Sequence, residues 1–329
     1  MTQPPFLTEE ARRGVLEQKF PESTVEIEKT HIINFAAAIR DDNPLWNDER
    51  AARKSRFGGL IAPPTFTRFV GSAARATGRG QYPLPGTVQV DGGTEWEYFG
   101  PIRPGDVITS HRKVTDVRER AGSVGPLIFI VVASTYVNQF GETVATQQST
   151  AIRYDATAVN SSAPEPVDQT EPTSEATSIG SPHHEHQLHW EDVAEGDEIP
   201  PLIRTTSTQD LVKYAGASRD FSEIHYDKDF ALSVGLPGVI LHGALKAAYL
   251  GKLVTDWIGE YGDLKKLGCQ HRGMDMPGNT TICGGRVKSK SASGDEHLVD
   301  CEIWLEDARG QKTVPGWATV ALPTKGLVS

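Results

Sequence analysis

The chain of 329 residues has 38% apolar and 23% charged side chains, the composition of a globular protein in water. One hydrophobic core rarely supports so long a chain, so we expect two domains of roughly 150 residues each. The formal charge of -10 argues against a nucleic-acid surface, and no run reaches the about 18 apolar residues of a membrane span. Neither nucleic acid nor a membrane is therefore expected as a partner.

Two features of the sequence concern the cellular location of the protein and its capacity for disulfides or a metal site. Residues 1–10 contain no basic stretch followed by an apolar run, so no secretory signal is expected and a cytoplasmic location is predicted. Cys269, Cys283 and Cys301 are odd in number and form no Cys-x-x-Cys pair. We therefore expect reduced thiols, with no disulfide framework and no metal site.

The first expected domain covers residues 1–155. Its central helix is predicted near Thr65–Ala76, where apolar side chains recur at helical spacing. Strand-like runs follow near Asp106–Val117, Leu127–Val137 and Thr143–Tyr154. This order implies a mostly buried helix packed against an antiparallel sheet.

A linker and a second domain follow. Residues 156–186 are rich in Pro, Ser, Thr and Glu and nearly free of large apolar side chains, so a flexible acidic tether is expected there. The second domain, residues 187–329, has a predicted helix near Ala244–Gly259. Its strand-like runs lie near Ile282–Lys288, Leu298–Leu305 and Thr313–Leu322.

The two expected domains are copies of one unit. A shift of 179 positions places DDNPLW, residues 41–46, on DFSEIH, residues 220–225. The same shift places GLIAPP, residues 59–64, on GVILHG, residues 238–243. Gly105 and Gly278 correspond at a shift of 173, as expected if the intervening loops differ in length. We infer that one fold was duplicated and that the copies then diverged.

Residues 214–243 of the second copy read YAGASRDFSEIHYDKDFALSVGLPGVILHG. This stretch resembles the motif of the MaoC-like (R)-specific enoyl-CoA hydratases and 3-hydroxyacyl thioester dehydratases. The first copy, with NPLW, GGLIAPPTF and EWEYFGPIRPGD, resembles the N-terminal MaoC-type dehydratase domain of double hot-dog enzymes. The resemblance implies an α+β double hot-dog, in which each unit is a long central helix wrapped by an antiparallel sheet. It also implies a homodimer of such chains.

The resemblance implies reversible hydration of a trans-2-enoyl thioester to the (3R)-3-hydroxyacyl thioester, with Asp220 and His225 as the catalytic pair. Hydration needs a base for water, a proton for C2 and donors for the enolate oxygen. His225 can take the proton from water because imidazole titrates near neutrality, and Asp220 can hold this water and supply the C2 proton. Backbone amides near His242 and Gly243 can donate to the oxygen. Ser222 can support the loop.

The first copy has lost the groups that this chemistry needs. Asp41 and Asn43 remain, but Trp46 stands where the second copy has His225, and an indole has no accessible basic site. Pro63 and Pro64 replace His242 and Gly243 and have no backbone N–H. We therefore expect one active site per chain, in the second copy. The first copy either shapes a tunnel for the acyl tail or serves only as a folding partner.

Several alternatives stay open at this point. The substrate carrier is CoA or acyl carrier protein, and the acyl group is fatty, branched dicarboxyl or a steroid side chain. No cofactor is implied, because CoA enters as part of the substrate. One alternative is a non-catalytic thioester-binding protein. In that case Asp220 is a helix cap, His225 is a core histidine and Gly243 is a packing residue. His242 is expected to shape the loop and not to transfer protons.

Overall fold

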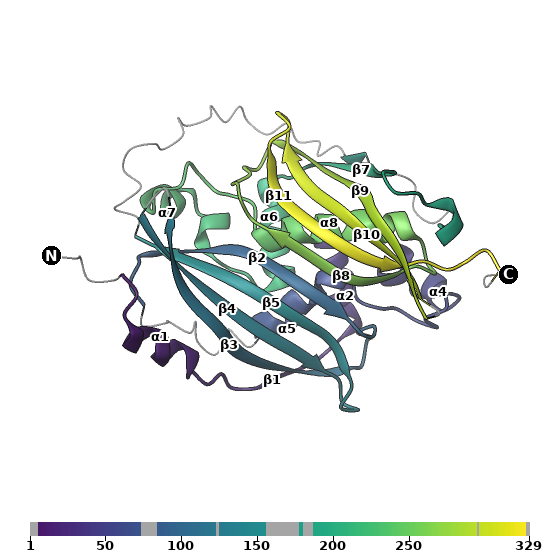
Figure 1. Cartoon of the computed structure of the whole chain (residues 1–329), viewed down its shortest axis with the longest axis horizontal. Helices are drawn as coiled ribbons and strands as arrows, with labels where there is room; N and C mark the ends of the chain where they lie inside the picture. Colours follow the sequence, from purple (N-terminus) through teal and green to yellow (C-terminus); the bar gives the residue numbers. More distant parts are fainter. Residues whose placement is uncertain are drawn as a thin grey trace.

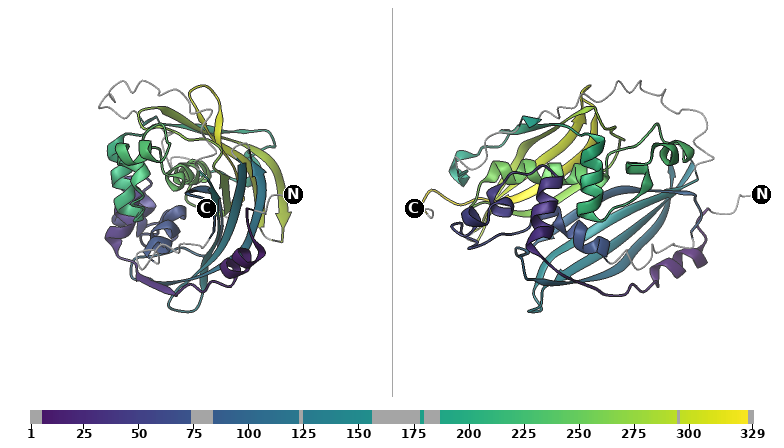
Figure 2. Two further views of the ribbon diagram at one scale, coloured as in Figure 1. Left: turned by 90° about the vertical axis from the view of Figure 1, so that its left-hand side faces the viewer. Right: turned by 180° about the vertical axis from the view of Figure 1, so that it is seen from behind.

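The computed structural model describes residues 6–73, 84–122, 125–155, 178–179, 187–294 and 296–326. In this part of the chain, one strongly curved antiparallel sheet forms a wall, and most of the helices lie on its inner side (Figure 1, Figure 2). The arrangement confirms the predicted α+β double hot-dog.

The order of the strands is symmetric about the middle of the sheet. It runs β1-β3-β4-β5-β2-β8-β11-β10-β9-β7-β6, so β2 and β8 join the two halves. These two strands pair antiparallel from Gly93–Gln270 to Glu97–Lys266. The strand bounds are Ser23–Glu26 (β1), Val88–Tyr98 (β2), Val107–Gly122 (β3), Gly125–Val137 (β4), Thr143–Tyr154 (β5), Ser178–Ile179 (β6), Glu198–Thr205 (β7), Asp263–Gln270 (β8), Thr280–Ser293 (β9), Glu296–Asp307 (β10) and Lys312–Ala321 (β11).

The helices repeat in the same order in both halves. The 3-10 turn η4 and the helices α7 and α8 begin 179 residues after α3, α4 and η1, while β9 begins 173 residues after β3. The predicted duplication is therefore confirmed. The bounds are Glu9–Leu16 (α1), Lys29–Ala38 (α2), Pro44–Asn47 (α3), Glu49–Ala52 (α4), Pro64–Phe66 (η1), Thr67–Ala73 (α5), Trp190–Asp192 (η3), Thr208–Ser218 (α6), Glu223–His225 (η4), Lys228–Ser233 (α7) and Gly243–Ile258 (α8).

The two copies also share an uncommon backbone conformation. Arg40 and Arg219, which lie 179 positions apart, have φ values of 53° and 59°. This left-handed region is rarely adopted by residues other than glycine, asparagine and aspartate. Arg219 ends α6, and the chain in both copies turns immediately before the corresponding residues Asp41 and Asp220.

One hydrophobic core spans both halves. The helix α8 is buried along most of its length and belongs to the same apolar cluster as α2 and α5 of the first half. Phe35 of α2 packs on Tyr214 of α6, with ring centroids 5.9 Å apart. Trp96 and Leu267, which pair across the β2–β8 junction, are buried in this cluster as well. The halves therefore fold around shared apolar contacts.

The predicted strands correspond to β3, β4, β5, β9, β10 and β11 and are confirmed, whereas β2 and β8 were not singled out. The helix expected at Thr65–Ala76 is confirmed as η1 and α5 up to Ala73, and residues 74–76 lie outside the described residues. The expected linker at 156–186 also lies outside them, except that Ser178–Ile179 pairs with β7. The limits of the domains, 1–155 and 187–329, stay predictions.

Among the described residues, no helix is long and apolar enough to cross a membrane.

Candidate active site

Three side chains of the second half meet at the start of α8. Asp220 follows α6, His225 ends η4, and His242 is the residue before α8. One ligand-type atom from each of them lies within 4.8 Å of the others. The structure thus brings together the side chains of Asp220, His225 and His242, which span 22 positions of the sequence, and Gly243 follows His242 as the first residue of α8.

His225 presents a neutral ring with one free basic nitrogen. Its Nδ1 lies 2.8 Å from the carbonyl oxygen of Ile240. Because a carbonyl only accepts, Nδ1 carries the hydrogen and Nε2 is left as the unprotonated nitrogen. Burial lowers the pKa of His225 below 6.5, so the neutral form prevails at neutral pH.

His242 packs face to face against His225. The ring centroids are 3.7 Å apart, and the planes are inclined by 22°. Its Nε2 lies 3.3 Å from the backbone carbonyl of Asp220, to which it can donate a hydrogen bond. Burial lowers the pKa of His242 to about 3, and the neighbouring His225 is the second cause of this decrease. A neutral His242 therefore connects the backbone of Asp220 to the ring of His225, in agreement with a role in loop shape.

Asp220 is held ionised by a residue of the first half. The guanidinium of Arg68, in α5, forms an ion pair with the carboxylate of Asp220. Burial raises the pKa of Asp220, but the ion pair with Arg68, together with the neighbouring His242 and His225, outweighs burial and holds this pKa well below its usual range. Sequence reasoning missed Arg68, because no local signal shows that α5 approaches α6 across the two halves.

The environment of Gly243 explains why a side chain is excluded there. A Cβ atom at Gly243 would lie 2.9 Å from Nε2 of His271, the residue that follows β8. The first two amides of α8, those of Gly243 and Ala244, have no acceptor within their own helix, whereas the amides of Leu245 and Lys246 donate to the carbonyl of His242. Gly243 thus keeps the end of α8 open beside the His271 ring.

Ser222 takes part in the η4 turn through its backbone. Its backbone carbonyl accepts a hydrogen bond of 3.1 Å from the amide of His225, which closes the η4 turn. Its side chain makes no capping hydrogen bond at this turn. Support of the loop by the Ser222 hydroxyl therefore stays a prediction.

The corresponding place in the first half is filled by a buried ion-pair network. Lys252 of α8 lies 3.2 Å from Asp41 and also contacts Asp42 and Asp256. Trp46, which stands in the position of His225, is buried, and Asn43 caps α3 through its side chain. Pro63 and Pro64 lead into η1. Among the described residues of the first half, Trp46 therefore replaces the imidazole that His225 provides in the second half.

The cluster of Asp220, His225 and His242 has the residue types of a metal site. However, Nδ1 of His225 and Nε2 of His242 face backbone carbonyls, and the Asp220 carboxylate is paired with Arg68. A guanidinium next to the carboxylate repels a cation, so this donor set is poorly arranged for one.

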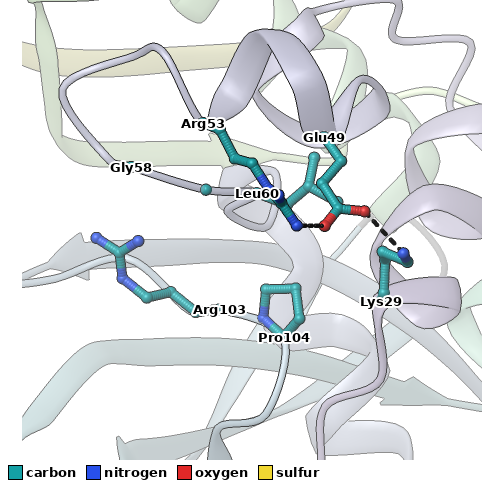
Figure 3. Close-up of a pocket in the computed structure, with 8 residues that line it drawn as sticks. Lys29, Glu49, Arg53, Gly58, Leu60, Arg103 and Pro104 are labelled. Atoms are coloured by element: carbon teal, nitrogen blue, oxygen red, sulfur yellow. Dashed lines mark hydrogen bonds and ion pairs between the residues drawn. The ribbon is translucent and has the colours of Figure 1, made fainter.

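A separate pocket of about 280 Å³ opens on the first half. Lys29 and Arg53 both reach Glu49 there, at 2.8 and 2.7 Å, and Arg103 lies on the opposite side (Figure 3). None of its lining residues belongs to the Asp220 cluster. Two of the three cations are already paired with Glu49, and we assign no ligand to this pocket.

The fold and the site define a double hot-dog protein with one Asp–His cluster at the start of its second central helix. Residues 16–147 match the FAS1-like dehydratase domain region, and residues 195–300 match the MaoC like domain. The chain therefore combines a FAS1-like dehydratase domain region with a MaoC like domain, and this combination supports a hydratase or dehydratase activity in general.

Individual relatives agree with this assignment. A UPF0336 protein of Saccharopolyspora erythraea is 31% identical over 134 residues, which are 40% of this chain and 83% of that protein. A probable enoyl-CoA hydratase alpha subunit of Thermomonospora curvata is 28% identical over 138 residues, 37% of this chain and 43% of that protein. The two relatives share a limited part of the chain, so their activities do not define this protein.

Solved structures match over nearly the whole chain. A MaoC-like dehydratase has a TM-score of 0.74 at 23% identity and covers 93% of this chain and 98% of its own. A double hot-dog protein of Mycobacterium tuberculosis has a TM-score of 0.63 at 12% identity, covering 93% of this chain and 96% of its own. At these identities the likeness establishes the fold.

Proposed function

We propose that the chain is an acyl-thioester hydro-lyase that adds water to a trans-2-enoyl thioester and removes it in the reverse direction. One observation carries the proposal: an ionised carboxylate, Asp220, and a neutral imidazole with a free Nε2, His225, lie side by side at the start of a buried helix. Hydration requires a general base whose pKa is close to neutral pH and a second group that holds the same water.

In the hydration direction, Nε2 of His225 takes a proton from the water as its oxygen bonds to C3. Asp220 holds this water through its carboxylate. Because Arg68 keeps Asp220 ionised and Asp220 therefore has no proton of its own, the proton that reaches C2 is the one that His225 took from the water, passed on directly or through the Asp220 carboxylate. One hydroxyl is thus added at C3 and one hydrogen at C2, and dehydration reverses both transfers. We propose the (3R) product, which chiral analysis of the hydroxyacyl group tests.

The backbone at the start of α8 supplies the stabilising donors. The N–H groups near Gly243 lack helical acceptors and stand at the positive end of the helix dipole. They can donate to the thioester oxygen as negative charge develops on it. CoA is the carrier we propose, and acyl carrier protein is the alternative that the assay includes.

The test follows the loss of 2-enoyl absorbance with crotonyl-CoA, a long-chain enoyl-CoA, a branched dicarboxyl enoyl-CoA and a crotonyl group on acyl carrier protein. We expect Asp220→Asn and His225→Ala each to lower kcat by about 10²- to 10⁴-fold, the usual contribution of a positioned acid or base. Trp46→Phe in the first copy should leave kcat unchanged. Equal activity in all four proteins, or no turnover by the native protein, would overturn the proposal.

The state of His225 also predicts the pH dependence. The base must be neutral, and its pKa is lowered by burial, so activity should be lost only as the pH falls below 6.5. Asp220 stays ionised throughout that range. We expect kcat/KM to be level from about pH 7 to about pH 9 and to decrease on the acid side. A decrease already centred at neutral pH would show that another group acts as the base.

A further inference from the structure

Arg68 and Asp220 come from different copies of the duplicated unit, and both lie largely out of contact with water. Arg68 stands on α5, and the exposed fractions of the two side chains are 16% and 18%. The Nε of Arg68 is buried and has no hydrogen-bond partner among the described residues. The ion pair is therefore the principal anchor of this guanidinium. In such surroundings an ion pair is screened far less than it is at a surface.

Burial and the ion pair act on Asp220 in opposite directions. Burial favours the neutral acid and raises the pKa, whereas Arg68 is the largest of the contributions that favour the carboxylate, and together these contributions lower the pKa. The other charged or titratable groups that act on Asp220 are His242 and His225, and Tyr214 of α6 and Asp91 of β2 act on Arg68. Since His225 and His242 are neutral at neutral pH, Arg68 is the one full positive charge in this set.

The first copy, which has Trp46 in place of His225, provides a comparison within the same chain. There Lys252 of the second half pairs with Asp41 of the first, so each half sends a cation from its central helix to the aspartate of the other. Burial nevertheless keeps the pKa of Asp41 above its usual value. In the site with His225, the pKa of the aspartate is shifted the other way. Each aspartate therefore faces a cation from the other half, and the two copies differ in the direction in which the pKa of the aspartate is shifted.

We propose that Arg68 is a positioning residue for the hydration site, which orients the Asp220 carboxylate and keeps it ionised when substrate binds. The inference rests on the proposed function and goes beyond it, because it makes the first half part of the catalytic apparatus. Arg68 acts through Asp220 and takes no proton itself. The first half is then neither only a tunnel wall nor only a folding partner.

The kinetic test compares Arg68→Met and Arg68→Lys with the native protein over the full pH range. Without the cation, burial is no longer outweighed, and the pKa of Asp220 should rise above its usual value by about 3 units, the effect of burial on a carboxyl group. We expect the acid limb of kcat/KM for Arg68→Met to move to higher pH, with a loss of at least about 10-fold at pH 6. Arg68→Lys should retain the native acid limb, because it keeps the charge.

Arg53→Met is the matched control, since Arg53 is an exposed arginine of the same half that pairs with Glu49. It should leave the profile unchanged. An acid limb of Arg68→Met that coincides with the native one would overturn the proposal. So would equal loss at every pH in both Arg68 variants, which indicates a structural role alone.

A second measurement does not depend on turnover. The carboxyl carbon of Asp220 can be titrated by NMR in protein labelled at aspartate, with Asp220→Asn used to assign its signal. We expect the native titration to lie far below that of Arg68→Met, and coincident titrations would refute the proposed role of Arg68. If the native protein hydrates no enoyl thioester but the two titrations still differ, the proposed function fails while the control of Asp220 by Arg68 stands.

Discussion

Replacing Gly243 by alanine is expected to lower kcat/KM by about 100-fold, the effect of misplacing reacting groups by a distance of about 1 Å. The new Cβ would lie 2.9 to 3.2 Å from three ring atoms of His271. Either the ring or the start of α8 must move, and both border the amides that we assign to the thioester oxygen. Steady-state kinetics with the preferred enoyl thioester measure the loss.

Gly251→Ala in the same helix is the matched control. A Cβ at Gly251 makes only ordinary contacts, the nearest at 3.6 Å from Leu267, and alanine favours a helix over glycine. Its kcat/KM should equal that of the native protein, and its thermal stability should be equal or higher. If Gly243→Ala is as active as Gly251→Ala, the thioester oxygen does not bind at the start of α8.

Replacing Lys252 by methionine is expected to reduce the free energy of unfolding by about 3–5 kcal/mol at neutral pH, the usual effect of removing one partner from a buried ion pair. Asp41 is 3% exposed and would keep a buried carboxylate without its cation. Denaturant unfolding monitored by tryptophan fluorescence measures the change.

The pH dependence of this loss has a definite sign. Burial already raises the pKa of Asp41, and removal of Lys252 raises it further. The folded state then binds a proton more readily than the unfolded state, so the destabilisation is largest above this pKa and shrinks as the pH decreases. A loss that is constant between pH 5 and pH 8 would argue against an uncompensated Asp41 charge.

Two variants serve as controls for Lys252→Met. Adding Asp41→Asn to it should recover part of the stability, because the double variant removes the uncompensated charge. Lys213→Met, at an exposed position of α6, should change the free energy of unfolding by no more than about 0.5 kcal/mol.

The sequence predicted those parts of the fold whose signals are local or repeated. Helix α8 and the strands β3 to β5 and β9 to β11 have clear apolar patterns, and the shift of 179 residues located both copies. By contrast, β8 contains Lys265 and Lys266 followed by Gly268, and β2 contains Gly92 and Gly93, residues that strands usually disfavour. These strands are stabilised by pairing with each other across the halves, and no local pattern records such pairing.

The residues of the candidate site likewise divide into those that the sequence could identify and those that only the packing of distant segments reveals. Asp220, His225 and Gly243 could be named because the resemblance attaches them to one continuous motif, and the structure brings the side chains of Asp220 and His225 together. Arg68, Lys252 and His271 could not be named, since each reaches its partner only through packing between distant segments. An Arg, a Lys and a His outside any motif give no indication of a functional role in the sequence alone. The roles of all six residues stay proposals until variants are measured.

The junction between β2 and β8 has a consequence for how this chain withstands cleavage. Its backbone hydrogen bonds and the apolar cluster beneath it join the halves without any need for a covalent connection. A protein cut once within residues 156–186 should therefore remain one particle in solution. It should also keep the two ion pairs between the halves, Arg68–Asp220 and Lys252–Asp41. Either fragment made alone would present β2 or β8 as a bare sheet edge and so be prone to aggregate.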